Sequence, residues 1–346
     1  MAEKSSKRTR KEAPETDTHG GQAANRLARE ALRSLSAGEI LAELAREDDR
    51  IVVLTADLKY ANRSADFEGL FPNRFFNVGI AEQNLVTVAA GMASCGKLPY
   101  VFTFASYLGL MCVEQMRTDC AFTNMPVRFV ATHSGMSMGY YGTSHHALED
   151  LGIMRTLANV TVVSVADPTE LEAVLRASLS HEGPMYIRLG RGRDPDVYTE
   201  PLDDFKLGKA IRLREGSDLT FVTAGSELAP CLEAADLLES RGIHARVVDL
   251  HTLVPIDRDE ILAAARETEA LMTVEEHNAI GGIGSAVADV LVDHGIGVRF
   301  KRHGVPNEYV PIGPPAALYA HYELDAPGIA KVAEAFLGSG GSTSKR

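Results

Sequence analysis

The chain has 346 residues, of which 45% are hydrophobic and 24% are charged, so it is long enough for two globular domains with cores of their own. Lysine and arginine number 35 against 47 aspartates and glutamates, and the net charge of −12 excludes the broad basic face of a nucleic-acid binder. A local basic pocket for a phosphate is not excluded. The four cysteines form no CxxC pair, which favours buried free thiols over disulfides.

The two ends of the chain are polar. Residues 1–26 and 339–346 offer almost no apolar surface, and we expect them to be disordered tails. The N-terminal segment lacks the apolar stretch of a signal peptide, and no apolar run reaches the ~18 residues that a bilayer span requires. The sequence therefore predicts a cytoplasmic protein that does not enter a membrane.

Residues 27–195 alternate short apolar runs with segments of helical periodicity. A helix is expected over 27–46 and another over 81–95, which Gly96 would end. A third helix is expected after Asp167, because aspartate is a good N-cap and Pro168 suits the first helical position. The apolar runs are typical of buried parallel strands. They lie at 51–56, 75–80, 100–104, 127–132, 160–165 and 185–189.

Residues 196–214 are polar and are expected to form a linker to a second domain over 215–338. Strands are expected there at 219–224, 245–250 and 270–276. Helices are expected to end near Arg241, to begin near Asp257 and to span 283–291. The GGIGS segment lacks a full GxGxxG pattern and indicates a tight strand-to-helix turn. The repeated strand–helix units predict an α/β fold of two doubly wound domains with mostly parallel sheets.

Chemically useful side chains follow the ends of the first-domain strands, where ligands bind in parallel sheets. Glu82 lies in the first turn of a helix, within VGIAEQN, and Phe104 and Tyr107 follow the strand at 100–104. Taken singly, Glu82 would suit the helix dipole and the two aromatic residues would suit an ordinary core.

A loop rich in glycine and serine runs from Thr132 to Asp150 and carries His133, His145 and His146, a composition typical of functional loops. No HxxxH pair or cysteine partner accompanies these histidines, so no metal site is expected. Arginines 188, 191 and 193 follow a strand and indicate either a bound anion or exposed linker charge.

Together, in this order, these motifs resemble the transketolase family of thiamine-diphosphate enzymes. The segments that carry the resemblance are GIAEQN, AAGMASCGKLPYVFTFASY, SHHALEDLGIMR and VADPTEL. The resemblance covers the chain from about residue 27 and corresponds to the pyrimidine-binding and C-terminal domains of a transketolase. Deoxyxylulose-phosphate synthases share GIAEQ, whereas the β subunits of 2-oxo acid dehydrogenases share the domain order but have different local motifs.

The resemblance implies how thiamine diphosphate is held. Glu82 matches the glutamate that hydrogen-bonds the aminopyrimidine ring and favours its imino tautomer, so that the exocyclic nitrogen can take a proton from the thiazolium ring. Phe104 and Tyr107 match the aromatic wall that stacks on the pyrimidine. Asp57 matches an aspartate at the end of the first strand, near the cofactor cleft.

The resemblance also implies a sugar site. His133 and His145 match two histidines that contact the hydroxyls and carbonyl of the donor. Arg191 matches the position that holds the sugar phosphate, and Arg33 is expected to supply a second cation. Tyr141, in GYYG, stands where the family usually has an aspartate that binds a sugar hydroxyl, so we expect a non-standard sugar or sugar-phosphate substrate.

The GDG motif that holds Mg²⁺ and the diphosphate in this family, together with a downstream asparagine, does not occur in the sequence. We therefore expect thiamine diphosphate and Mg²⁺ to be held mainly by a partner, an N-terminal transketolase subunit that carries GDG and the asparagine. An α₂β₂ heterotetramer follows as the expected assembly.

The expected function is that of the C-terminal subunit of a split transketolase, which moves a two-carbon ketol unit from a ketose to an aldose. One alternative is the β subunit of a 2-oxo acid decarboxylating enzyme, which the intact GIAEQ and histidine motifs disfavour. The other is a non-catalytic regulatory subunit, which the retention of Glu82, the aromatic residues and the histidines disfavours.

Overall fold

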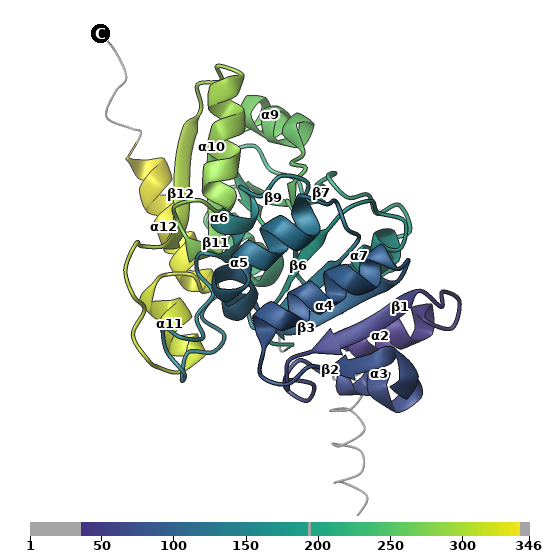
Figure 1. Cartoon of the computed structure of the whole chain (residues 1–346). Coiled ribbons are helices and arrows are strands. Elements are labelled where there is room, and N and C mark those ends of the chain that lie inside the picture. Colours follow the sequence, from purple (N-terminus) through teal and green to yellow (C-terminus); the bar gives the residue numbers. More distant parts are fainter. Residues whose placement is uncertain (1–35, 193–194, 340–346) are drawn as a thin grey trace, which may run out of the picture.

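The computed structural model describes residues 36–192 and 195–339, and it contains two sheets flanked by helices (Figure 1). The strands of the larger sheet are β1 Ile51–Thr55, β2 Phe75–Asn77, β3 Leu98–Phe104, β4 Arg128–Thr132, β5 Thr161–Val165, β6 Met185–Leu189 and β10 Thr252–Val254. The strands of the smaller sheet are β7 Ile211–Arg214, β8 Leu219–Thr223, β9 Ala245–Asp249, β11 Ala270–Asn278 and β12 Arg299–Val305.

Both sheets are parallel except at one edge. The larger sheet has the order β10-β5-β6-β4-β3-β1-β2, and only β10 is antiparallel to its neighbour. The smaller sheet has the order β12-β11-β8-β9-β7, and only β7 is antiparallel. The prediction of two doubly wound, mostly parallel α/β domains is therefore confirmed.

Helices cover the sheets on both sides (Figure 1). Those of the first domain are α2 Ala37–Leu44, α3 Ala65–Leu70, α4 Glu82–Ser94, α5 Val113–Gln115, α6 Asp150–Met154 and α7 Pro168–Ser178, with the 3₁₀ turn η1 Pro72–Arg74 and the π-helical turns η2 Tyr107–Met111 and η3 Met116–Ala121. Those of the second domain are η4 Gly225–Glu227, α8 Leu228–Glu239, α9 Arg258–Glu267, α10 Ile283–Asp293, α11 Pro315–His321 and α12 Ala326–Gly338.

Successive side chains of β1 point to opposite faces of the larger sheet, and both sets are apolar, so both faces are covered. Val52 and Leu54 point to one face, where they join a buried cluster with Leu85 of α4. Ile51 and Val53 point to the other face and join a cluster that contains residues of α2 and α7. All five residues of β1 are buried, as the continuous apolar run predicted.

The caps predicted from the sequence are present. The Asp167 side chain accepts a hydrogen bond of 2.8 Å from the Glu170 amide and begins α7, with Pro168 in the first turn. Asp257 caps α9 in the same manner. Gly96 and Gly242 follow α4 and α8 with φ of +84° and +78°, a conformation that favours glycine.

The two domains are joined more closely than the sequence indicated. Strand β10 comes from the second domain but pairs with β5 of the larger sheet. Val222 and Leu271 of the smaller sheet belong to the same buried cluster as Val101 and Phe129 of the larger one. The interface between the domains is thus part of the hydrophobic core, because one face of each sheet is buried within it.

Several expectations need correction. Strand β7 occupies residues 211–214, inside the interval expected to be a linker, and both β7 and β10 are short edge strands whose apolar runs are too brief to recognise. Strand β2 ends at Asn77 rather than residue 80, because it lies at the sheet edge with partly exposed residues. Cys95 is exposed, whereas the other three cysteines are buried and all four are free.

Some expectations fall on residues outside the described part of the chain. These are the tail at 1–26, the tail at 339–346 apart from Ser339, and the first part of the helix at 27–46, of which Ala37–Leu44 is helical. Among the described residues, no helix is long and apolar enough to cross a membrane.

Candidate active site

The carboxyl edge of the larger sheet gathers the residues that the sequence singled out. Asp57 follows β1, Glu82 begins the helix after β2, Phe104 ends β3, His133 follows β4 and Arg191 follows β6. Because these strands are parallel neighbours in register, their ends meet at one edge of the sheet.

Glu82 presents a buried carboxylate that is available to a ligand. It is the first residue of α4 and is 6% exposed, and no described residue hydrogen-bonds to its carboxylate. Burial, and to a lesser extent the charge of Glu82, raise the pKa of Tyr107, and the same two causes raise that of Cys112 to about 12. Glu82 therefore lies within electrostatic reach of Tyr107, and its oxygens can bond a ligand.

Four rings form a continuous cluster beside this carboxylate. The Phe104 ring centroid lies 5.4 Å from that of Tyr107 and 4.4 Å from that of His133. The Tyr107 hydroxyl lies 3.1 Å from Nε2 of His145. Tyr107 opens the π-helical turn η2, an irregularity that often marks functional sites. The cluster offers an aromatic surface with two imidazoles at its border.

His133 is buried and electrically neutral. It is 5% exposed, and its Nδ1 lies 3.0 Å from the Thr132 hydroxyl. Burial lowers the pKa of His133 to about 4, with smaller contributions from the charges of Arg191 and His145. Burial also lowers the pKa of His145. Near neutral pH, each ring can therefore donate one hydrogen bond and accept another.

We expect the His133 ring to show no titration between pH 5.5 and 8 in ¹³C-histidine NMR spectra of the chain, with the signal assigned from a His133→Gln variant. In the urea-unfolded chain the same ring should titrate near 6.5. Because the folded pKa lies below the unfolded one, the stability from burying neutral His133 is complete above about pH 6.5 and is lost as the pH falls toward 4. A folded-state transition near pH 6.5 would contradict this assignment.

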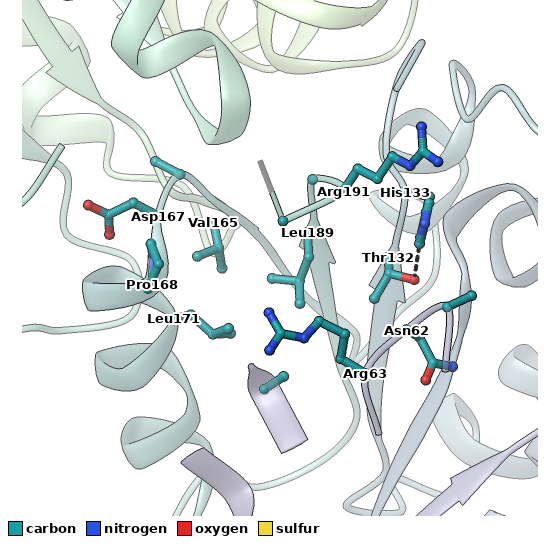
Figure 2. Close-up of a pocket in the computed structure, with 15 residues that line it drawn as sticks. Asn62, Arg63, Thr132, His133, Val165, Asp167, Pro168, Leu171, Leu189 and Arg191 are labelled. Atoms are coloured by element: carbon teal, nitrogen blue, oxygen red, sulfur yellow. Dashed lines mark hydrogen bonds between the residues drawn. The ribbon is translucent and has the colours of Figure 1, made fainter. Parts of the chain in front are cut away.

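A pocket lies at the same edge of the sheet, next to His133 (Figure 2). The Arg63 side chain points into it, and Arg191 lines it from the other side. Arg63 lies in the segment between β1 and α3, and its Nε is 3.8 Å from Asp66. Both arginines bring positive charge to the pocket lining, which suits an anion such as a phosphate. Their guanidinium groups point in different directions, however, and Nη1 of Arg191 donates to the Ser137 carbonyl at 3.4 Å (Figure 2). Asn62 and Thr132 add polar groups to the lining.

The arginines differ from the sequence-based expectation. Arg33, named as the second cation, lies outside the described residues, as does Arg193, whereas Arg63 was missed. Its segment, ANRSADFE, resembles an ordinary helix start, and only its position shortly after a strand end could have pointed to it. Arg188 is not an anion site, because it is 2% exposed and pairs with Asp150 and Glu276.

Two further predicted residues lie at the border of the site. Asp57 is exposed and hydrogen-bonds the Asn77 side chain rather than any residue of the ring cluster. Tyr141 is 58% exposed, and its ring centroid lies 5.0 Å from that of His145. Among the described residues, no group of three or more histidine, cysteine, aspartate or glutamate side chains is placed to hold a metal ion.

Comparison with known proteins identifies the class of protein to which this fold and this candidate site belong. Residues 32–195 match the transketolase pyrimidine binding domain, and residues 208–329 match the transketolase C-terminal domain. The chain is 36% identical to an apulose-4-phosphate transketolase subunit of Phocaeicola vulgatus, over 86% of this chain and 95% of that protein. The chain therefore belongs to the transketolase family, as the sequence motifs indicated.

Two other similarities bear on the extent of the match. The chain is 39% identical to 1-deoxy-D-xylulose-5-phosphate synthase 1 of Geobacter sulfurreducens over 88% of its own length, but it spans only 48% of that enzyme. It thus covers about half the length of this curated relative. A solved split gene transketolase, an inactive beta4 tetramer, superimposes with a TM-score of 0.80 at 41% identity, covering 90% of this chain and 98% of that one.

Proposed function

We propose that this chain is the C-terminal subunit of a split thiamine-diphosphate-dependent transketolase, which transfers a two-carbon ketol unit from a ketose to an aldose. The observation that carries the proposal is the buried Glu82 carboxylate, to which no described residue hydrogen-bonds, beside the ring cluster. That arrangement fits an aminopyrimidine ring, because the carboxylate can bond a ring nitrogen while Phe104 and Tyr107 stack on the ring face. When bound, the thiazolium part supplies the nucleophilic carbon that the transfer needs.

The residues of this chain then have distinct tasks. Glu82 holds or accepts a proton at the pyrimidine nitrogen. His133 and His145 hydrogen-bond the carbonyl and hydroxyls of the donor sugar, and their low pKa values keep them neutral enough to accept a proton as well as donate one. Arg63 and Arg191 hold the phosphate or another anionic group of the sugar. Asp57 borders the cofactor cleft.

A partner subunit completes the site in this proposal. The sequence contains no GDG motif, so Mg²⁺ and the diphosphate would be held mainly by an N-terminal subunit with GDG and its asparagine. An α₂β₂ assembly would place each cofactor between two different chains. Two relatives support a divided enzyme, since one is named as a transketolase subunit and the other as a split gene transketolase that is inactive as a β₄ tetramer.

The direct test is reconstitution. This chain, mixed with a chain from the same organism that carries the GDG motif, thiamine diphosphate and Mg²⁺, should release an aldose from a ketose and extend an added aldose by two carbons. The chain alone should not. Similarity to a deoxyxylulose-phosphate synthase favours one second candidate, condensation of decarboxylated pyruvate with an aldose. Product formed from pyruvate and not from ketoses would establish that alternative.

Tyr141 is expected to set the sugar preference. Replacing it with aspartate should restore a hydrogen-bonding carboxylate. We therefore expect Tyr141→Asp to raise kcat/KM for ordinary pentose phosphates, relative to kcat/KM for the sugar that the wild-type complex prefers, by about 10²-fold. Tyr140→Asp is a matched control, because Tyr140 is 60% exposed and Tyr141 is 58% exposed. A wild-type complex that already prefers pentose phosphates, with a ratio unchanged by Tyr141→Asp, would contradict this role.

A further inference from the structure

The loop that carries both histidines rests on the second domain. Gly135 and Ala147 exchange backbone hydrogen bonds of 3.1 and 3.0 Å, which close the loop between His133 and His145 at its base. Glu276, near the end of β11, lies directly against this base. Gly135 has a φ of +55°, and a β-carbon there would collide with the Glu276 carboxylate, so the close approach requires glycine.

The Glu276 carboxylate is buried and accepts three hydrogen bonds from protein donors. The residue is 2% exposed. Its Oε1 accepts hydrogen bonds from the Ser134 hydroxyl and from Nη1 of Arg188, the latter at 2.8 Å. Its Oε2 accepts a bond from the Tyr319 hydroxyl of α11. Ser134 directly follows His133 in the chain, so this carboxylate of the second domain is tied to the neighbour of an active-site histidine.

Arg188 extends the same contact to the other side of the loop. Its Nη2 donates 3.0 Å to the carbonyl of Ala147, two residues after His145. Its Nε donates 2.8 Å to Asp150, which begins α6. Glu276 therefore acts on both segments of the loop, on one through Ser134 and on the other through Arg188.

His133 needs such support because its backbone is strained. Its φ of +63° lies in the left-handed region, which residues with a β-carbon rarely adopt unless their surroundings hold them there. The ring direction follows from this conformation, since it brings the imidazole against Phe104 and next to the Thr132 hydroxyl. The amides of His133 and Ser134 donate to the carbonyls of Gly190 and Leu189, at 3.2 and 3.1 Å, and the Ser134 hydroxyl adds its bond to Glu276. Loss of the hydroxyl would leave the two amide bonds in place but remove the side-chain restraint next to His133.

We propose that Glu276 is a positioning residue for His133 and acts on it through Ser134 across the domain boundary. No described residue of the second domain lines the pocket of Figure 2, whereas Ser226 and Tyr319 of that domain line a neighbouring pocket together with Arg191. The contact argued here is the one that Glu276 makes with the histidine loop. The proposal rests on the proposed function for its effect on rate. The orientation of the His133 ring can be measured without any activity.

Ser134→Ala is the sharpest variant, because it removes one hydroxyl and leaves every ion pair in place. In the assembled complex we expect kcat to fall by up to about 10²-fold, as a displaced catalytic group would cause, with a smaller change in KM. The His133 signals in ¹³C-histidine spectra of the isolated chain should shift. Glu276→Gln should likewise lower kcat, and it should shift the His133 signals in the same direction as Ser134→Ala does.

Ser178→Ala is the matched control. Ser178 is also a buried serine with a side-chain hydrogen bond, here to Tyr100, but it ends α7 and meets β3 near the start of that strand, away from the carboxyl edge that carries His133. The Ser178→Ala variant should have a lower melting temperature than the wild type, with unchanged kcat and unchanged His133 signals. The proposal is overturned if Ser134→Ala keeps the wild-type kcat and His133 signals, or if both serine variants lose activity only in proportion to stability. A wild-type complex without ketol transfer would refute the proposed function, while the NMR comparison would still decide the positioning role.

Discussion

Glu82→Gln is expected to lower the kcat of the reconstituted complex by about 10²–10⁴-fold, the usual contribution of a positioned acid–base group. Glutamine preserves the size of the side chain but cannot take up or carry the proton in the same way. The effect should appear in initial rates of ketol transfer at saturating substrate. The affinity for thiamine diphosphate, measured by calorimetry, should change much less, since the stacking surface of Phe104 and Tyr107 remains.

Glu114→Gln serves as the control for this variant. Glu114 is an exposed glutamate of α5 that pairs with Arg117 on the surface, and its replacement should leave the rate unchanged. Unchanged turnover in Glu82→Gln would favour the alternative of a non-catalytic subunit that has retained the fold.

Arg188→Met is expected to reduce the free energy of unfolding by about 3–5 kcal/mol, the cost of removing one partner from a buried ion pair. Arg188 is buried together with Asp150 and Glu276, both within 2.8 Å of its guanidinium nitrogens. The attraction of these carboxylates raises the pKa of Arg188 above its ordinary value, although burial alone would lower it. Methionine would leave both carboxylates in the core without their cation.

The measurement is urea unfolding of the isolated chain. Arg176→Met is a suitable comparison, because Arg176 forms an exposed i,i+4 pair with Glu172 on α7 and should contribute about 0.5 kcal/mol or less. If both variants lose the same small amount of unfolding free energy, then the buried ion pairs of Arg188 with Asp150 and Glu276 do not stabilise the junction of the domains.

The sequence predicted those parts of the fold that local patterns determine. Continuous apolar runs marked the parallel strands, and the cap at Asp167 followed from its own side chain and the proline behind it. The carboxyl-edge rule then placed Glu82, Phe104 and His133 at one edge, because parallel strands end there together. Most of the candidate site was therefore predictable from residue type and order.

The remainder depends on contacts between distant residues, which no local pattern reports. Arg188 and Glu276 are 88 residues apart in the chain and belong to different domains, so their pairing was not predictable. The sequence left Arg188 open between an anion site and exposed linker charge, and the structure shows neither, since Arg188 is buried in ion pairs. Strand β10 joins the sheet of the other domain through three residues. Arg63 has no motif of its own, and only the folded chain brings it into the pocket with Arg191.

The most direct test of whether this chain is one half of a divided enzyme is to isolate it by affinity from its native host. The chains that co-purify with it are then identified by mass and sequence. The account predicts a stoichiometric partner that carries GDG and a downstream asparagine, and a complex that binds thiamine diphosphate with Mg²⁺ and transfers a ketol unit. A chain that is isolated without a partner, binds no thiamine diphosphate with Mg²⁺ and converts no ketose would contradict it.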